Sequence, residues 1–351
     1  MSDTRRPKSK ISAQTVILLA VLWAVVSLIV FLLGSPISPR PQWYGIATYA
    51  LENLAFLGAA LLCLRNWRSS QIVSGRGVWL LFAIGMLSYF MGNLILGWWE
   101  LVWDLSPDVS PADFFYLLTY LALGVGMLLA VISKRLSLTA GQYGIVAAIA
   151  VGGLALAYYV SYGGAEDSAR SPYSPSLMPA AVAQAPPPSA APPETPSPSP
   201  EAPPAAPVPQ ANPAPTPPEG TVPPPAEVEP PAEASSAPAW VVALNEQLSP
   251  FADPVGLLYV AGDVFLLVMA TILLLAFWGG RFSTSWRFIA AAAFSFYIAD
   301  IWFAYAISQL DNYETGELPE VFWIFSAVLF SIGAALEYSL STRSRRVRRR
   351  S

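Results

Sequence analysis

The chain has 351 residues, of which 54% are hydrophobic and 12% are charged, and its formal net charge is -4. A water-soluble domain cannot bury so many apolar residues when they come in uninterrupted runs long enough to cross a bilayer. The absence of histidine removes the usual haem ligand, the commonest zinc ligand and the commonest general base, and the single cysteine, Cys63, excludes an intrachain disulfide.

Eight apolar runs predict an all-α fold, a polytopic membrane helix bundle. Each run is close to the length of about 20 residues that spans the hydrocarbon core of a bilayer. The first is too long and too apolar to be a cleaved signal peptide, and the fifth is weakly hydrophobic because it contains Gly152 and Gly153. In chain order the predicted spans are 14–33, 43–65, 77–98, 112–133, 141–162, 254–277, 286–306 and 318–340.

The basic residues predict the orientation of these spans. Lys and Arg residues near the ends of spans stay on the cytoplasmic side of a membrane. With both termini in the cytoplasm, 17 of the 19 basic residues lie on that side, and only Arg40 and Arg170 lie outside. We therefore expect a multi-pass protein of the bacterial cytoplasmic (inner) membrane with cytoplasmic N and C termini.

The membrane-embedded part of the sequence contains an internal repeat. Trp79 and Asn93 recur in the same register as Trp286 and Asp300, with similar residues between them. Each copy has four spans, an even number, so the two copies are expected to be parallel repeats rather than inverted ones. Further matches pair Tyr49 and Asn53 with Tyr259 and Asp263, and Pro111 and Phe114 with Pro319 and Phe322.

A proline-rich tract interrupts the second repeat. It holds 25 of the chain's 34 prolines, between Pro172 and Pro238, and such a composition cannot bury a core and favours polyproline II. We expect a disordered extracytoplasmic linker, which is either a tether for a cell-wall or protein partner or a tolerated insertion in a surface loop. The expected domains are a basic cytoplasmic N-terminus (1–13), the first membrane repeat (14–133), the first span of the second repeat (141–162), the linker (163–250), the remainder of the second repeat (254–340) and a basic cytoplasmic tail (341–351).

Five polar residues lie inside the predicted spans, away from the span ends and in the outer half of the membrane. No basic residue lies deep in any span to neutralise the acids among them, so the acids must be protonated, bound to a cation, or held by hydroxyl and amide donors. The functional interpretation is a site for a cation, a proton or an amine-bearing ligand. The structural interpretation is a protonated acid that hydrogen-bonds neighbouring helices together.

The repeat favours the functional interpretation for Asp263 and Asp300, which it places symmetrically. The structural interpretation is favoured for Asn53 and Asn93, and Glu52 stays open between the two. Tyrosines one helical turn from two of these residues share a helix face with them. The candidate ligand-binding residues are Asp263, Asp300, Glu52, Asn53, Asn93, Tyr49 and Tyr259.

Aromatic and acidic residues crowd the predicted outer loops, at 98–104 and 311–323. Most such rings form an interfacial belt, although rings beside acids at a pocket mouth can hold a cationic or flat ligand. Ser110 and Asp113 predict an N-cap and a first-turn acid that begin the fourth span.

No other pattern indicates chemistry. The sequence has no phosphate-binding glycine loop, no metal-ligand spacing and no Ser-His-Asp candidate, so we expect no cofactor and no metal, and an enzyme is the least supported class. The arginine-rich tail lies so close to a span that we expect it to contact lipid head groups, with no nucleic-acid partner.

Three segments carry a resemblance to a known family. They are 253–263 with Ala299-Asp300, then Tyr313 and Gly316 before Trp323, and 110–117 in the first copy. Over about residues 43–133 and 253–340 the chain resembles the multi-span sensory region at the N-terminus of some bacterial diguanylate cyclases and sensor kinases. The resemblance implies a membrane domain that senses a signal and passes it to a cytoplasmic output. This sequence has no cyclase, kinase or PAS-like module after the last span, so we expect either a separate cytoplasmic signalling partner or a sensor that has lost its output.

The expectation from sequence is a non-enzymatic sensory or ligand-binding membrane module, with Asp263 and Asp300 lining an outward-facing acidic and aromatic pocket. One alternative is a small ion-coupled transporter that uses the same acids. The other is a membrane anchor for a proline-rich tether, in which the linker matters and the pocket does not.

Overall fold

The structure is a computed structural model, and it describes residues 12–37, 39–133, 138–162, 237–277, 283–310 and 313–348. Within these residues all regular secondary structure is helical, and eight helices are long and apolar enough to cross a membrane. This confirms the prediction of an all-α fold with eight helices of the length and apolarity that a membrane span needs. Most of the proline-rich linker, residues 163–236, lies outside the described residues.

The helices begin and end within a few residues of the predicted spans, except at α6 and the end of α3, which are described below, and at the end of α9. Helix α9 continues eight residues past the predicted end of its span, to Arg348, so most of the predicted tail (341–351) is helical. Their bounds are α1 (Ala13–Gly34), α2 (Gln42–Arg68), α3 (Arg76–Trp103), α4 (Pro111–Ile132), α5 (Ala140–Tyr162), α6 (Ala239–Leu248), α7 (Ala252–Ala276), α8 (Ser283–Gln309) and α9 (Val321–Arg348). Two short 3-10 turns, Ser249–Phe251 and Leu318–Glu320, precede α7 and α9.

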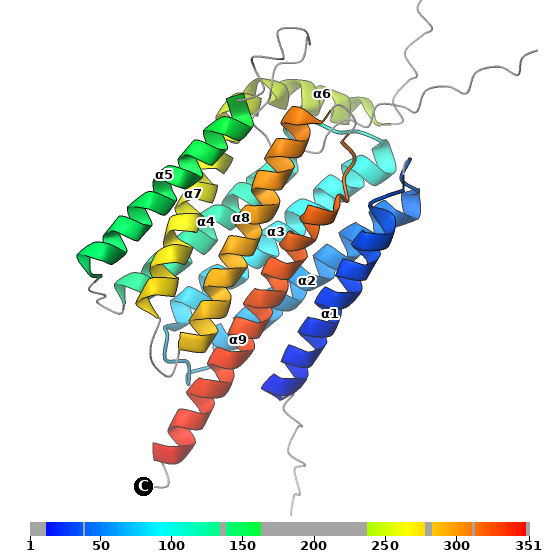
Figure 1. Ribbon diagram of the computed structural model, residues 1–351. Coiled ribbons are helices and arrows are strands. Elements are labelled where there is room, and N and C mark those ends of the chain that lie inside the picture. Colours follow the sequence, from blue (N-terminus) through cyan, green and yellow to red (C-terminus); the bar gives the residue numbers. More distant parts are fainter. Residues whose placement is uncertain are drawn as a thin grey trace, which may run out of the picture. The chain divides into compact units, whose positions relative to one another are not determined.

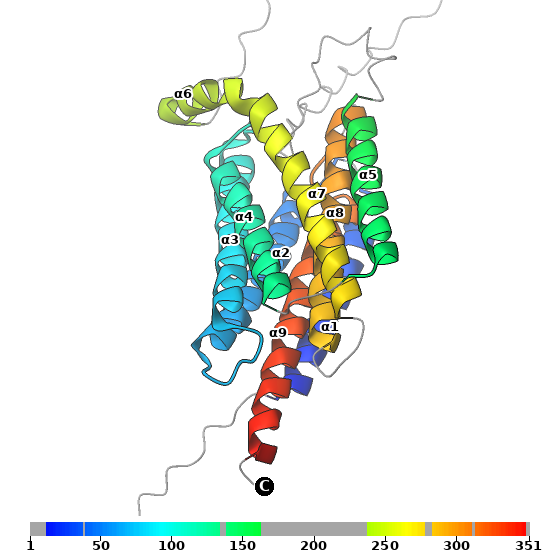
Figure 2. The same ribbon diagram turned by 90° about the vertical axis from the view of Figure 1, so that its left-hand side faces the viewer.

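Six of the helices close into a ring. In order around it, α2, α3, α4, α7, α8 and α9 each pack against the next, and α9 packs back against α2 (Figures 1 and 2). Helix α1 lies outside the ring against α9 and α2, and α5 lies outside it against α7 and α8. Both outer helices leave many large apolar side chains exposed, as expected for surfaces in contact with lipid.

Large aromatic residues fill the inside of the ring over one half of its length, measured along the helices. The Trp79 and Trp286 rings lie 6.2 Å apart, the Phe82 and Phe330 rings lie 5.5 Å apart, and all four side chains are at most 1% exposed. Trp79 and Trp286 lie near the first residues of α3 and α8. This packed half is at the end of the bundle where α1 begins and α9 ends (Figure 1).

The opposite end carries α6, and we call it the α6 end (Figure 1). The predicted linker extends too far, because Ala239–Leu248 are helical. Their side chains find partners in the bundle: Val241 is buried, and the Trp240 ring lies 5.8 Å from the Trp103 ring. Trp99 donates a hydrogen bond from Nε1 to Asn245 Oδ1 at 3.3 Å.

Helix α3 is the second exception. It continues five residues past the predicted end of its span, to Trp103, so the residues from Trp98 to Trp103 are helical rather than part of an outer loop. Their aromatic side chains pack against one another at the α6 end; for example, the Trp99 and Trp103 rings lie 4.6 Å apart. The extension keeps Glu100 on a helix, where it faces the bundle.

Candidate functional site: an acidic and aromatic cavity

A cavity lies inside the ring, towards the α6 end. It holds about 60 Å³ of space for the centres of water-sized molecules, enough for roughly four to six waters. All six ring helices contribute to its wall. The lining residues are Phe31, Thr48, Tyr49, Glu52, Tyr89, Asn93, Leu96, Glu100, Tyr116, Tyr120, Tyr259, Phe296, Asp300, Phe303, Thr315, Glu320 and Trp323. We call this the inner cavity.

The wall of the inner cavity combines carboxylates with aromatic rings. Four of the lining residues are acidic, nine are aromatic, and none of those that the structure describes is basic. In the described part of the chain, no three Asp, Glu, Cys or His side chains come together as a metal-binding group. The chemistry of the wall therefore suits an organic cation, which both carboxylates and the faces of aromatic rings attract.

A donor from a neighbouring helix holds three of these four carboxylates in place, and donors from the segment just before α9 hold Glu320. Tyr89 Oη donates to Glu52 Oε1 at 2.7 Å, and Tyr49 Oη donates to Glu100 Oε2 at 2.6 Å. Trp323 Nε1 donates to Asp300 Oδ1 at 2.7 Å. Glu320 accepts hydrogen bonds from the Tyr313 hydroxyl and, at 2.7 Å, from the backbone N–H of Gly316. These bonds fix the positions of the acids without adding a positive charge.

Tyr120 connects the two aspartates that the sequence singles out. Its hydroxyl oxygen lies 2.9 Å from Asp263 Oδ1 and 2.7 Å from Asp300 Oδ2. A tyrosine hydroxyl has one proton to donate, and the two carboxyl groups also hydrogen-bond each other, so one of the acids must carry a proton that it donates to the tyrosine oxygen or to the other carboxyl group. Asp300 already accepts from Trp323 and faces the cavity, so we assign the proton to Asp263 and the negative charge to Asp300.

The structure separates the seven residues predicted from sequence into three groups. The first group lines the inner cavity and contains Tyr49, Glu52, Asn93, Tyr259 and Asp300. Asp263 forms the second group: it lies behind Tyr120 and does not line the cavity. Asn53 forms the third, because its amide donates to the Tyr49 carbonyl of its own helix at 2.9 Å and it also does not line the cavity.

Asn93 is the amide most closely associated with the site. Its Oδ1 accepts from Tyr116 Oη at 2.6 Å, and the residue is 4% exposed. Its Nδ2 is on the side of Glu52 but does not reach hydrogen-bond geometry with any described residue. A buried amide N–H without a partner costs free energy, so Asn93 offers a donor that a ligand or a water molecule can satisfy.

Several lining residues escaped the sequence analysis. Glu100 and Glu320 were assigned to outer loops, although α3 and the 3-10 turn before α9 carry them to the cavity wall. Tyr116 and Tyr120 are four residues apart on α4 and share a face with Asp113. That spacing was the one signal in the sequence from which the α4 wall could have been predicted.

The predicted cap of the fourth span is confirmed, and it also joins two helices. Ser110 is the N-cap of α4, and its backbone N–H donates to Asp113 Oδ2 at 2.7 Å in a capping box. The other oxygen, Asp113 Oδ1, accepts from Tyr259 Oη at 2.7 Å. The cap thus links α4 to α7. This is one of the two places where the helices α2, α3 and α4 meet the helices α7, α8 and α9; the other is between α2 and α9.

A second cavity opens beside the inner one, closer to the α6 end. It holds about 310 Å³ for water-sized molecules, and we call it the vestibule. Asp104 lies in its wall and ends α3 in the left-handed conformation, with φ of 51°, which aspartate tolerates better than most residues. The residues that line both cavities are Tyr49, Glu100 and Thr315.

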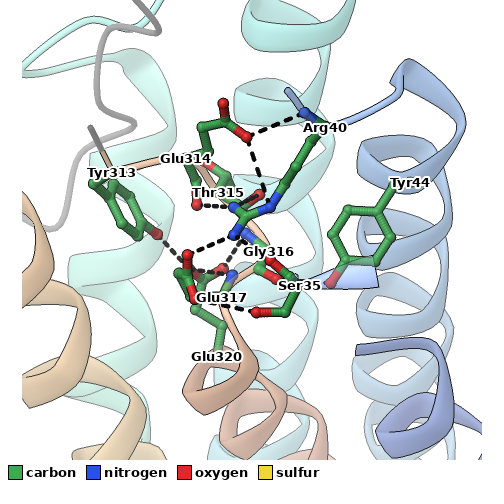
Figure 3. A network of polar contacts seen from close by, with 9 residues as sticks. All are labelled: Ser35, Arg40, Tyr44, Tyr313, Glu314, Thr315, Gly316, Glu317 and Glu320. Atoms are coloured by element: carbon green, nitrogen blue, oxygen red, sulfur yellow. Dashed lines mark hydrogen bonds and ion pairs between the residues drawn. The ribbon is translucent and has the colours of Figure 1, made fainter. Parts of the chain in front are cut away.

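A cluster around Arg40 closes the α6 end between α2 and α9, and Figure 3 shows its contacts. Arg40 Nη2 lies 2.5 Å from Glu317 Oε1, and its Nη1 donates to the carbonyl oxygens of Glu314 and Thr315. Ser35 Oγ donates to Glu317 Oε2 at 3.1 Å. The cluster therefore ties the α1–α2 loop to the segment before α9, and its ion pair offsets the one basic residue that the structure describes on the predicted outer side.

Two further contacts complete this cluster. Tyr44 Oη donates to the Gly316 carbonyl at 2.7 Å (Figure 3). Gly316 has φ of 101°, and a Cβ there would lie 2.8 Å from the Tyr44 ring, so only glycine fits. Burial and the neighbouring Glu320 carboxyl raise the pKa of Tyr313 well above its usual value, so Tyr313 stays a neutral hydrogen-bond donor.

No protein-family model matches this sequence, and no curated protein or solved structure is significantly similar to it.

Proposed function

We propose that this integral membrane protein is a non-enzymatic sensory or ligand-binding module whose inner cavity binds a small organic cation from outside the cytoplasm. The observation that carries the proposal is the composition of the wall, with four carboxylates, nine aromatic rings and no described basic residue. In a cavity of low dielectric constant, a cation gains from a carboxylate and from each ring face it contacts. The size of the cavity restricts the ligand to a small ion.

The outward orientation rests on charge. We propose that both termini lie in the cytoplasm of a bacterial cell, so that the α6 end, with both cavities, faces the extracytoplasmic side. Three described basic residues lie where α2 ends and α3 begins, at the end of the bundle opposite α6 (Figure 1). They are Arg65, Arg68 and Arg76. Arg40 is the described exception, and its pairing with Glu317 makes a positive charge tolerable on the outer side.

The proposal includes two parallel repeats that share the site. Contacts recur 207 residues apart: Tyr116 donates to Asn93, and Trp323 donates to Asp300. In the same register, the capping box at the start of α4 has its counterpart at Glu317–Glu320. An offset of 207 residues pairs Ala112 with Pro319. The match of Pro111 with Pro319 in the sequence uses an offset of 208 and therefore differs from this register by one residue.

Close helix contacts recur in that register too. A Cβ on Gly126 would lie 2.7 Å from the Phe82 ring, and a Cβ on Gly333 would lie 2.7 Å from Ile289, again 207 residues later in both cases. Helices α1 and α5 depart from the symmetry, because α1 packs against α9 and α2 whereas α5 packs against α7 and α8. The matching parts are therefore the two three-helix halves of the ring.

Because both halves of the ring line the cavity, a bound ligand can change how the two halves pack against each other. The two halves of the ring meet at α2 with α9 and at α4 with α7, and both halves supply cavity residues. A cation that binds one packing arrangement of these halves more tightly than another shifts the population towards it. We propose that a separate cytoplasmic partner detects this shift at the opposite end of the ring.

Transport is the alternative class, and the packing of the ring disfavours it. A carrier must open its site alternately to both sides of the membrane. Here the vestibule lies on one side of the inner cavity, and Trp79, Trp286, Phe82 and Phe330 fill the ring on the other. A carrier would have to separate these four packed side chains in its inward-open state, and we favour binding because it does not require that rearrangement.

Thermal unfolding of the purified protein tests the proposed ligand class. The panel consists of ammonium, methylammonium, trimethylammonium, tetramethylammonium and choline, with sodium as the ionic-strength control. A cation that fits the cavity, present at about 100 times its Kd, should stabilise the protein by about 2.7 kcal/mol, which raises the melting temperature by several degrees.

The matched variants are Glu52→Gln, in the cavity wall, and Glu246→Gln, on an exposed face of α6. We expect the first to reduce the cation-induced shift and the second to leave it unchanged. Equal shifts for both variants, or no shift with any organic cation, would contradict the proposed site.

A further inference from the structure

The inner cavity and the vestibule meet at a wall that contains one hydrogen bond between side chains of α2 and α3. Tyr49, Glu100 and Thr315 line both cavities. Tyr49 Oη donates to Glu100 Oε2 at 2.6 Å across this wall. The Tyr49 ring lies against the backbone of α3, since a Cβ on Gly97 would be 3.1 Å from the ring. On the α3 side the ring therefore faces a glycine rather than a bulky side chain.

Glu100 has capacity to bind something more. Its second oxygen, Oε1, is buried and has no hydrogen-bond partner among the described residues. A carboxylate oxygen buried without a donor is costly, and an ammonium group or a water molecule would satisfy it. Because Glu100 lines both cavities, a ligand can reach it from the vestibule and leave it towards the interior.

The charges of the vestibule favour the entry of cations. Its charged lining residues are Arg40, Glu100 and Asp104. Arg40 is held by Glu317 at 2.5 Å and Glu314 at 3.7 Å, so its charge is largely compensated. The two carboxylates remain, and acidic clefts with walls of low dielectric constant concentrate cations and speed their entry.

We propose that Glu100 is an outer binding station for small organic cations and that Tyr49 is the latch between this station and the inner cavity. An ammonium group in the vestibule binds Glu100, and the Tyr49 hydroxyl then releases Oε2 and lets the ligand pass. Glu52, three residues further along α2 from the latch, and Asp300 receive it inside. The inference rests on the proposed function for its ligand class, and its test does not need an equilibrium ligand.

The test measures how fast small thiol reagents reach a cysteine in the inner cavity. The background is Cys63→Ala, which removes the single native thiol, and the reporter is Leu96→Cys, in the inner cavity wall. The reagents are the cationic 2-aminoethyl and the anionic 2-sulfonatoethyl methanethiosulfonates. We expect the cationic reagent to react at least about tenfold faster than the anionic one. The Glu100→Gln variant should lose most of this preference.

The latch is tested with Tyr49→Phe, which removes the hydroxyl and keeps the ring. It should raise the reaction rate of both reagents severalfold. The matched control is Thr119→Val, which loses a buried hydrogen bond from Thr119 Oγ1 to the Gly85 carbonyl at 3.1 Å, away from both cavities, and should not raise the rate. Thr48→Cys, also in the inner wall, repeats the measurement if the first reporter position unfolds the protein.

The outcomes separate this inference from the proposed function. Unchanged rates in Tyr49→Phe together with an intact charge preference in Glu100→Gln would overturn the latch and the station, even if amines stabilise the wild type. The expected pattern of rates in a protein that no amine stabilises would support the route and refute the proposed ligand class.

Discussion

Asp300→Asn will weaken the binding of a small organic cation at least about tenfold, or 1.4 kcal/mol, whereas Asp263→Asn will leave the affinity within about twofold of the wild type. The two residues occupy similar depths and both touch the Tyr120 hydroxyl, but their protonation states differ. Asp300 is the ionised member and lines the cavity. Asp263 carries the shared proton, so an asparagine amide can replace it as a donor to Tyr120.

Asparagine is a well-matched replacement at both positions. At position 300 its carbonyl can still accept from Trp323, and its NH₂ group can donate to Tyr120 Oη, whose own proton then turns to an oxygen of the protonated Asp263 carboxyl group. The hydrogen bonds are thus retained and only the charge is lost. The measurement is calorimetric titration of both variants with the cation that stabilises the wild type most. Equal losses of affinity in the two variants would refute the assignment of the proton, and no loss in either would remove Asp300 from the site.

Gly262→Ala will destabilise the protein by about 1–3 kcal/mol and also weaken cation binding. A Cβ on Gly262 would lie 2.6 Å from Cδ1 and 3.0 Å from Cγ of Tyr120. Those atoms belong to the base of a packed ring, which cannot swing away as the tip of a long side chain can. The ring must therefore shift, and its hydroxyl leaves the position between Asp263 and Asp300.

The matched control is Gly152→Ala in α5, where nothing lies within 4 Å of the added methyl group. Alanine is a better helix former than glycine, so this change should be neutral or slightly stabilising. Thermal unfolding of both variants in the same detergent measures the difference. A Gly262→Ala protein as stable as the control would mean that α4 and α7 separate easily, and that Tyr120 is not held rigidly against the acids.

The membrane-spanning helices could be predicted from sequence because the bilayer imposes a length on apolar runs. The cap at Ser110 and Asp113 could be predicted for a similar reason, since capping depends on residues three apart in one segment. Helix α6 could not, because ten residues after a proline-rich tract form a helix only through contacts such as that of Trp240 with Trp103.

The site was predicted in part, and the limits are physical. Polarity inside a span indicated Glu52, Asn93 and Asp300, because a polar residue in hydrocarbon needs a partner. The different roles of Asp263 and Asp300 depend on Tyr120, which contacts both aspartates from α4. The internal repeat in the sequence does not reveal that this tyrosine lies between them. Glu100 lies two residues beyond the predicted end of its span, and Glu320 lies at the start of its span among residues grouped with an outer loop, so hydropathy alone indicated neither as a site residue.

The measurement that tests the central claim most directly compares a cation with its uncharged isostere. Choline and 3,3-dimethylbutan-1-ol have nearly the same shape and differ by replacement of the quaternary nitrogen with carbon. Calorimetric titration of the purified wild type with each isolates the contribution of charge in the acidic and aromatic cavity. The account predicts that choline binds at least about tenfold more tightly. Equal affinities, or tighter binding of the alcohol, would contradict it.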